Sequence, residues 1–232
     1  MIVLHYTGMQ TGEAAIARLR DAEARVSAHY VVEEDGRVFR LISEERRAWH
    51  AGKGSWQGET DCNAASIGIE IVNPGHEFGY RAFPEAQVQA VIALVSDIRE
   101  RWTVPDWRII GHSDLAPTRK EDPGELFPWK DLARAGHGLW FEPAPERIAA
   151  LGPPLKPGDE GLGVHVLQSG LRRLGYGIEI TGRYDELTAA VVTAFQRHWR
   201  QASVDGVADG ETRARLVGLL QLAQAESVTG VI

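Results

Sequence analysis

Residues 66–72 read SIGIEIV, and this stretch decides the fold. The three isoleucines fall on one face of an extended chain, whereas Gly68 and Glu70 fall on the other, which is the period-2 pattern of a β-strand. One carboxylate therefore shares a strand face with a glycine.

The segments on both sides of this strand predict an α/β domain. Residues 2–7 alternate in the same way, so His5 and Leu4 face opposite sides. Asp35-Gly36 supplies the positive φ of a tight turn and predicts a hairpin. In chain order we expect a strand at residues 2–7, a helix at 12–25, hairpin strands at 27–32 and 38–42, an amphipathic helix at 84–101 and a short strand at 107–111. The expected fold class is α/β, with a mixed central sheet flanked by helices.

A proline-rich stretch separates this domain from a smaller one. Five prolines lie between Glu142 and Asp159, which is typical of a linker. Beyond it, apolar residues at helical spacing predict a small three-helix C-terminal domain. Residues 182–188 and 206–212 share the pattern G-x-x-D-x-x-T, in which each aspartate is well placed to cap the following helix. We expect a first domain at residues 1–141, a linker at 142–158 and the helical domain at 159–225.

The composition excludes several classes of function. The chain of 232 residues has 44% hydrophobic and 25% charged residues, and it contains no stretch near the roughly 18 apolar residues of a membrane span. Its net charge of −7 and pI near 5.6 argue against broad contact with nucleic acid or anionic lipid, which require a basic surface. We expect no nucleic-acid partner and no membrane span, while the oligomeric state stays open.

Cys62 and the first residues bear on the cellular compartment. Cys62 is the single cysteine, so an intramolecular disulfide and a cysteine-rich metal site are excluded, and we expect a small buried residue. Residues 1–5 have no basic region, and their apolar run is too short for a signal peptide. We expect a cytoplasmic protein, or a periplasmic one if a longer natural N-terminus carries an export signal.

Three candidate metal ligands come from separate parts of the first domain. His5 lies within a strand, His112 just after another, and Asp122 in the loop that follows. Two imidazoles and a carboxylate leave the fourth tetrahedral position of a zinc ion (Zn2+) open for water, which distinguishes catalytic from structural zinc sites. Asp122 precedes a proline and is biased towards an extended backbone, in which Lys120 and Asp122 project to the same side.

Glu70 and Lys120 are the candidate catalytic residues. Zinc lowers the pKa of bound water to about 7, so a nearby Glu70 carboxylate can take the proton as that water attacks an amide carbonyl. Glu70 then returns the proton to the leaving nitrogen. Lys120 can stabilise the negative charge that develops on the tetrahedral oxygen.

Several blocks of the first domain resemble the zinc-dependent N-acetylmuramoyl-L-alanine amidases of the AmpD and AmiD type. They occur in that family's order and cover about residues 1–140, and the last is the most specific. The blocks are IVLHYT at residues 2–7, VSAHY at 26–30, AWHAG at 48–52, NAASIGIE at 63–70 and GHSDLAPTRKEDPG at 111–124.

The resemblance implies an enzyme that cuts the bond between N-acetylmuramic acid and L-alanine in peptidoglycan fragments (muropeptides). It places the zinc ligands on His5, His112 and Asp122, the catalytic glutamate on Glu70 and the catalytic lysine on Lys120. Residues 158–220 resemble a three-helix peptidoglycan-binding module, through short motifs such as YDELT at 184–188. Both parts of the chain imply the same polymer.

The roles of several other residues stay open at this stage. Trp49 suits stacking on a sugar or peptide beside His50 in a substrate cleft, or it belongs to the core. Arg25 aligns with a residue that contacts muropeptide carboxylates in some relatives, or it is a solvated helix end. His29 is expected to be structural rather than a fourth ligand. Asp61 stands where several relatives have arginine, which puts the peptide specificity in doubt.

Two alternatives to a cytoplasmic recycling amidase remain. One is a periplasmic amidase that remodels the cell wall, which the wall-binding module favours. The other is a non-catalytic peptidoglycan-recognition protein, which the retention of all three ligands and both catalytic residues disfavours.

Overall fold

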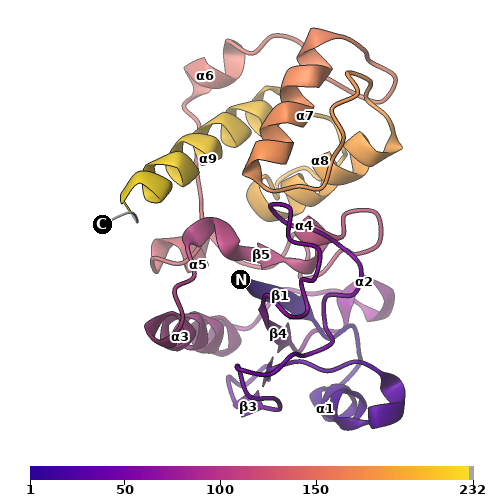
Figure 1. Ribbon diagram of the computed structural model, residues 1–232, viewed down its shortest axis with the longest axis vertical. Helices are drawn as coiled ribbons and strands as arrows, with labels where there is room; N and C mark the ends of the chain where they lie inside the picture. Colours follow the sequence, from indigo (N-terminus) through magenta and orange to yellow (C-terminus); the bar gives the residue numbers. More distant parts are fainter. Residues whose placement is uncertain (230–232) are drawn as a thin grey trace.

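A five-stranded mixed sheet forms from the alternating segments. The structure, a computed structural model, describes residues 1–229 (Figure 1). The strands are β1 (Ile2–Tyr6), β2 (Tyr30–Val32), β3 (Val38–Arg40), β4 (Ile67–Ile71) and β5 (Ile109–Gly111). Their order is β3-β2-β4-β1-β5, and all neighbouring pairs are parallel except the hairpin of β2 and β3. The predicted α/β class with a mixed sheet is confirmed.

The isoleucine face of the sheet is covered by two helices. Side chains of α3 (Glu85–Arg101) and α5 (Trp129–Arg134) form one apolar cluster with Ile2, Leu4 and the isoleucines of β4. This burial explains why the isoleucines lie on that face of the sheet.

The remaining short elements lie at the ends of the strands. They are α1 (Gly12–Arg20), η1 (Ala22–Ala24), α2 (Gly75–Phe78), η2 (Asp106–Arg108) and α4 (His112–Leu115). The helix expected at 12–25 ends early, because Asp21 adopts an extended backbone and its carboxylate instead accepts the Glu23 N–H of η1. The strand expected at 107–111 is shortened by η2.

Strand register brings two of the candidate site residues together. β1 and β4 pair in parallel with His5 beside Glu70, so both side chains leave the same face of the sheet on adjacent strands. The opposite faces of His5 and Leu4 are confirmed, since Leu4 lies in the cluster under α3.

The C-terminal part contains the three expected helices, α7 (Leu162–Leu174), α8 (Glu186–Trp199) and α9 (Gly210–Thr229). The repeated G-x-x-D-x-x-T pattern is a capping device, as predicted. Asp185 accepts the Thr188 N–H and Asp209 accepts the Thr212 N–H, each at 2.8 Å. Two buried glutamines also bind the two copies of the repeat, which we did not predict. Gln168 accepts the Gly182 N–H and donates to the Arg183 carbonyl, and Gln196 forms the equivalent bonds with Gly206 and Val207.

The proline-rich stretch is folded rather than extended. It contains α6 (Pro145–Ala149), which packs against α9, and Leu155 pairs with Ala208. A single apolar cluster joins the two parts of the chain, since Val3, Ile110 and Trp56 of the first domain pack with side chains of α7, α8 and α9. Figure 1 shows the helical module seated directly on the first domain.

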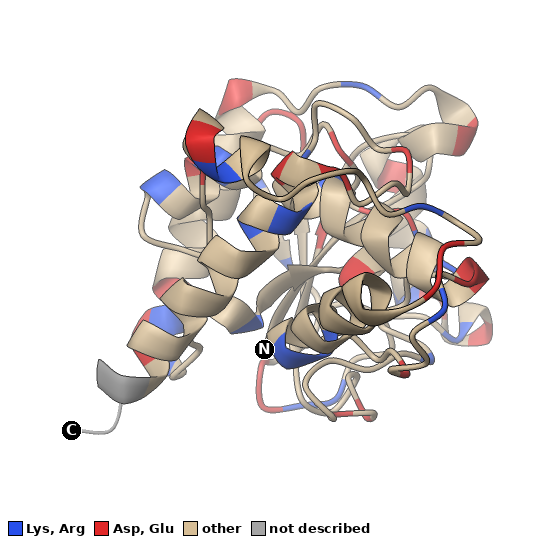
Figure 2. Cartoon of the chain, turned by 90° about the horizontal axis from the view of Figure 1, so that it is seen from above, with Lys and Arg blue, Asp and Glu red and all other residues tan. Residues whose placement is uncertain are grey.

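The surface carries charges of both signs. Viewed from above, acidic and basic residues are interspersed along the helices and loops (Figure 2). Within residues 1–229, no helix combines the length and apolarity that a membrane crossing requires.

Candidate active site

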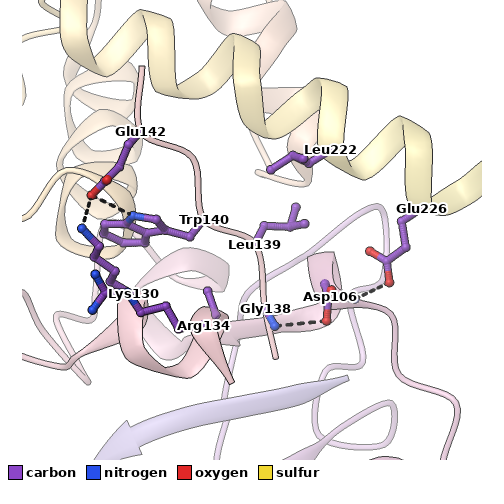
Figure 3. A pocket seen from close by; sticks show the side chains of 10 residues that line it. Asp106, Lys130, Arg134, Gly138, Leu139, Trp140, Glu142, Leu222 and Glu226 are labelled. Carbon is purple, nitrogen blue, oxygen red and sulfur yellow. Dashed lines mark hydrogen bonds and ion pairs between the residues drawn. The ribbon is translucent and has the colours of Figure 1, made fainter. Parts of the chain in front are cut away.

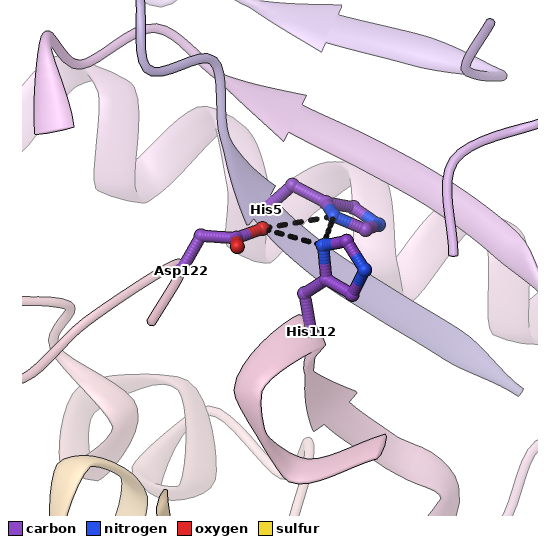
Figure 4. Close-up of side chains that lie close together, drawn as sticks. All are labelled: His5, His112 and Asp122. Atoms are coloured by element: carbon purple, nitrogen blue, oxygen red, sulfur yellow. Dashed lines mark hydrogen bonds and ion pairs between the residues drawn. The ribbon is translucent and has the colours of Figure 1, made fainter. Parts of the chain in front are cut away.

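His5, His112 and Asp122 converge on one point (Figure 4). His5 projects from β1, His112 opens α4 directly after β5, and Asp122 lies in the loop beyond. The two Nδ1 atoms are 2.9 Å apart, and Asp122 Oδ2 lies 3.0 Å from His5 Nδ1 and 2.9 Å from His112 Nδ1. All three side chains are buried.

Hydrogen bonds at the outer nitrogens fix where the imidazole protons are. His112 Nε2 lies 2.9 Å from the Ala51 carbonyl oxygen, which can only accept, so Nε2 carries the proton and Nδ1 presents a lone pair. The Ala51 segment is itself held by Asn63, whose Oδ1 accepts the N–H groups of His50 and Ala51 at 2.9 and 2.8 Å.

His5 is fixed through a chain of three groups. The Ser66 hydroxyl donates its proton to the Cys62 carbonyl. The Ser66 oxygen lies 3.4 Å from His50 Nε2, and it can therefore only accept a hydrogen bond from that nitrogen. His50 is therefore protonated on Nε2, and its Nδ1 accepts from His5 Nε2 at 2.9 Å. His5 Nδ1 consequently presents a lone pair, like His112 Nδ1.

The cluster therefore brings together three acceptors with no proton between them. Two lone pairs and a carboxylate oxygen at such short range repel one another unless a cation lies among them. A metal ion with ligand distances of about 2.0–2.2 Å can touch three atoms that are this close together. The donor set and its spacing thus fit a single divalent metal ion.

The ionisation of the cluster suits metal binding. Burial, together with the neighbouring His112, lowers the pKa of His5 to about 4. Burial and the nearby His5 also hold the pKa of His50 well below its ordinary value. Burial opposes ionisation of Asp122, but the two ligand histidines outweigh it and hold the pKa of Asp122 well below its usual range. Near neutral pH the site therefore offers a neutral His5 imidazole and the Asp122 carboxylate.

Glu70 lies beside the cluster in a contrasting environment. Its Oε2 atom is buried and has no hydrogen-bond partner among residues 1–229. Burial, and secondarily the charge of Asp122, raises the pKa of Glu70 well above its usual value. Lys120 lines the same hollow, of about 310 Å³, as Glu70 and the three ligand residues. The structure thus places all five predicted metal and catalytic residues in one hollow.

The three predicted substrate contacts occupy different places. Trp49 lines the hollow and is 55% exposed, so the core alternative is wrong for this residue. His50 also lines the hollow, but it is buried and bonded to His5. Arg25 lines a neighbouring hollow of about 470 Å³ whose wall includes Trp49. Contact of these residues with substrate stays a prediction.

Two further predictions concern residues outside the cluster. His29 is structural, because its Nε2 donates to the Arg46 carbonyl and its Nδ1 accepts the Gly68 N–H, each at 2.9 Å. Cys62 is buried, as expected. Asp61 forms an ion pair with Arg47 at 2.6 Å, and the Arg47 guanidinium lies 4.2 Å from the centre of the Trp49 ring.

A larger hollow, of about 500 Å³, lies between α5 and α9 (Figure 3). Its wall includes Trp140, whose indole N–H faces Glu142, and Lys130, which pairs with the same carboxylate. It contains none of the candidate metal or catalytic residues.

Hydrolases that use a metal ion need ligands with one coordination position left for water, and a base beside that position. His5, His112 and Asp122 could supply such ligands on an α/β scaffold, and Glu70 lines the same hollow. The fold and the site are thus of the kind that a metal-dependent hydrolase requires.

Comparison with known proteins identifies the family. The N-acetylmuramoyl-L-alanine amidase family matches residues 1–125, and a peptidoglycan-binding domain matches residues 160–216. This chain belongs to the N-acetylmuramoyl-L-alanine amidase family. The AmiD amidase of Escherichia coli strain K12 is 36% identical over 95% of this chain and 82% of its own length. The AmpD amidase of the same organism is 37% identical over 47% of this chain and 57% of its own length.

Solved structures agree with this assignment over nearly the whole chain. The complex of E. coli AmiD with an anhydro-muramyl peptide substrate has a TM-score of 0.81 and 35% identity, covering 96% of this chain and 88% of that chain. AmpDh3 from Pseudomonas aeruginosa has a TM-score of 0.82 and 32% identity, covering 96% and 91%. The predicted amidase family, its fold and its peptidoglycan-binding module are confirmed.

The residues that support the candidate ligands were not predicted from the sequence. Ala51, Asn63 and Ser66 lie in the AWHAG and NAASIGIE blocks, but nothing in the sequence showed that they support the candidate ligands, because these roles depend on tertiary contacts. Tyr176 and His198 of the helical module also reach the ligand loop, and their separation from His112 in the chain concealed this.

Proposed function

We propose that this chain is a zinc-dependent amidase that releases L-alanyl peptides from N-acetylmuramic acid, or its 1,6-anhydro form, in peptidoglycan recycling. One observation carries the metal assignment: two imidazole lone pairs and the Asp122 carboxylate lie 2.9–3.0 Å apart with no proton between them. Zinc is favoured because two nitrogens and one oxygen are its usual ligands in catalytic sites. When bound, the ion lowers the pKa of a water molecule to about 7 and polarises the scissile carbonyl.

Glu70 is the proposed general base and acid. Its unpartnered Oε2 takes the proton of the attacking water as a new C–O bond forms at the amide carbonyl carbon. The same oxygen then delivers that proton to the alanine nitrogen as the C–N bond breaks. A carboxyl group with a raised pKa suits this exchange, because it holds a proton more readily than an ordinary glutamate.

Lys120 is the proposed electrostatic stabiliser. It lines the hollow beside Asp122, so its ammonium group can face the oxygen that gains negative charge in the tetrahedral state. A fixed positive charge in a mostly buried site stabilises such an oxygen more than it would in water.

Trp49 and Arg25 are the proposed substrate contacts. One face of the Trp49 ring is covered by Arg47, and the exposed remainder suits stacking on a sugar ring. Arg25 lines the adjoining hollow, where its guanidinium can pair with a stem-peptide carboxylate. We propose that His50 acts mainly through its hydrogen bond to His5.

The choice of substrate is supported by the relatives. AmiD was solved with anhydro-N-acetylmuramic acid-L-Ala-D-γ-Glu-L-Lys, and AmpDh3 with an anhydromuramic pentapeptide. We propose a catalytic unit at residues 1–141 and a peptidoglycan-binding unit at 159–225, joined by residues 142–158. The matches at 1–125 and 160–216 support this division. The binding unit also favours a second candidate, an amidase that acts on the wall itself in the periplasm.

Mass spectrometry of reaction products tests both candidates. The full chain is incubated with a purified anhydro-muropeptide and, separately, with intact sacculi, with and without a chelator. We expect free stem peptide from the anhydro-muropeptide, lost on chelation and restored by zinc. Release from that substrate alone supports the recycling enzyme, and release from sacculi supports the wall amidase. A folded, zinc-loaded chain that releases peptide from neither substrate would refute the proposal.

A further inference from the structure

We propose that the C-terminal helical module holds in place the segment of the catalytic domain that carries the proposed metal ligands His112 and Asp122. Tyr176 and His198 act as positioning residues for His112. This inference rests on the proposed function, because it concerns the same metal site. It gives the module a task in catalysis that is separate from binding the cell wall.

Asp114 is the point of contact. It lies two residues after His112 within α4 and has no exposed surface. Its Oδ2 accepts the Gly111 N–H at 2.8 Å and the His198 Nδ1–H at 2.7 Å, and its Oδ1 accepts the Tyr176 hydroxyl at 2.6 Å. Two of these three donors come from the module, so the catalytic domain alone leaves a buried carboxylate only partly satisfied. Such a group is costly unless all its partners are present.

The His198 ring is clamped between the two parts of the chain. It stacks on Trp129 of α5 and on Trp199 of its own helix, each with ring centres 3.6 Å apart. The Trp199 indole N–H donates to the Leu139 carbonyl at 2.9 Å, which ties α8 to the catalytic domain again. The orientation of the His198 Nδ1–H towards Asp114 is thus fixed by stacking on both faces.

The same helix also holds the loop that carries Asp122. Arg197 pairs with Glu121 at 2.6 Å, directly beside Asp122 in the chain. Gln201, just beyond α8, donates from Nε2 to the backbone carbonyls of Glu125 and Phe127 at 2.6 and 2.7 Å. Within the catalytic domain, the Ser113 N–H donates to the Asp122 carbonyl at 2.9 Å and links the two ligand loops.

A third contact reaches the segment that orients the His112 ring. Trp56, which is fully buried, lies edge-to-face with Tyr176 at 5.0 Å, and the Gln57 N–H donates to the Gly175 carbonyl at 2.7 Å. This segment follows Ala51, the acceptor for His112 Nε2. His112, at the start of α4, and Asp122, in the following loop, therefore lie on segments that the module braces, whereas His5 lies on β1 inside the sheet.

The test separates the hydrogen bond from the stacking. His198→Phe keeps a ring between the two tryptophans but removes the donor, and His198→Asn keeps an N–H near the Nδ1 position but removes the ring. Tyr176→Phe removes only the hydroxyl. His165→Phe is the matched control, because His165 is an exposed residue on α7. Each full-length protein is measured for zinc affinity by competition with a chromophoric chelator, for kcat and KM on an anhydro-muropeptide, and for its melting temperature.

We expect His198→Phe and Tyr176→Phe each to weaken zinc binding by roughly 10-fold and to lower kcat, as is usual when support for a ligand is lost. KM should change by less than about twofold, since neither residue lines the hollow around the ligands. His198→Asn should recover most of the zinc affinity despite a lower melting temperature, and His165→Phe should match the wild type.

Wild-type zinc affinity and kcat in His198→Phe would overturn the inference. Equal losses in His198→Phe and His198→Asn would overturn it too, because they would point to packing alone. Failure of the wild-type chain to bind zinc would overturn the proposed function and this inference together. A zinc-binding wild type with unaffected variants would overturn this inference alone.

Discussion

Gly68→Ala should disable the site from a position that touches neither metal nor substrate. A Cβ on Gly68 would lie 2.4 Å from Cγ and 2.5 Å from Nδ1 of the His50 ring, where ordinary contacts are 3.4–4 Å. The ring would have to retreat by about 1 Å, and His50 is only 9% exposed. The hydrogen bond of 2.9 Å from His5 Nε2 to His50 Nδ1 would then break.

Two effects of known size follow from this displacement. Overpacking of a filled interior costs about 1–3 kcal/mol of folding free energy. Loss of the partner that orients a metal-bound histidine weakens metal binding roughly 10–100-fold, or about 1.4–2.8 kcal/mol. Gly68 is not among the glycines with positive φ, so backbone strain does not add to either effect.

Urea unfolding and zinc competition measure the two effects separately. The control is the same substitution in a His50→Ala background, where the added methyl group meets no ring. There, Gly68→Ala should change stability and zinc affinity by less than about 0.5 kcal/mol, because the interaction that it disturbs is already gone. Additive effects of the two substitutions, or wild-type zinc affinity in the single variant, would refute the steric reasoning.

Three other outcomes are expected. Glu70→Gln should lower kcat by roughly 10²–10⁴-fold, yet stabilise the metal-free protein at pH 8 in urea unfolding. That gain in stability should shrink towards pH 4.5. Because the pKa of Glu70 is raised in the folded protein, folding disfavours its carboxylate form, and the wild type loses stability as the pH rises through that pKa. A difference in stability that does not depend on pH would contradict this prediction. Lys120→Met should lower kcat roughly 10²–10³-fold while zinc affinity, measured by chelator competition, stays within a few-fold; a large loss of affinity would mean that Lys120 shapes the metal site. Asp185→Ala should cost about 1 kcal/mol in urea unfolding through loss of the α8 cap, and an unchanged midpoint would exclude that capping role.

Local periodicity predicted the strands and the three C-terminal helices, because alternation and helical spacing depend only on near neighbours in the chain. The same reasoning identified the face of β1 that carries His5. Strand register is a property of pairing between distant segments, so the position of His5 beside Glu70 could not be predicted from the sequence. The early end of the first helix depended on one side chain, Asp21, which caps η1 instead of extending α1.

The candidate site residues could be proposed from the sequence because their order repeats a family pattern, and the structure brings them into one hollow. The groups that support them could not be predicted. The proline content of residues 142–158 indicated a linker, but it gave no sign that this segment contains α6, which packs against α9, or that the module shares a core with the first domain. Proline content reports backbone preference and carries no information about tertiary contact. The repeated motif around Asp185 predicted a helix cap, but a local motif also carries no information about tertiary contacts. It therefore gave no sign that the adjoining α8 reaches Asp114.

The two acidic groups of the hollow have opposite pKa shifts because their surroundings differ. Burial disfavours the charged form of both Asp122 and Glu70, but two imidazoles face Asp122, and its pKa falls while that of Glu70 rises. In the proposed mechanism, this difference suits Asp122 to metal binding and Glu70 to holding and releasing a proton. The charge of Asp122 is itself one cause of the raised pKa of Glu70. Replacing Asp122 by a neutral residue would consequently alter the base as well as the metal site, so the loss of activity in such a variant measures both effects together.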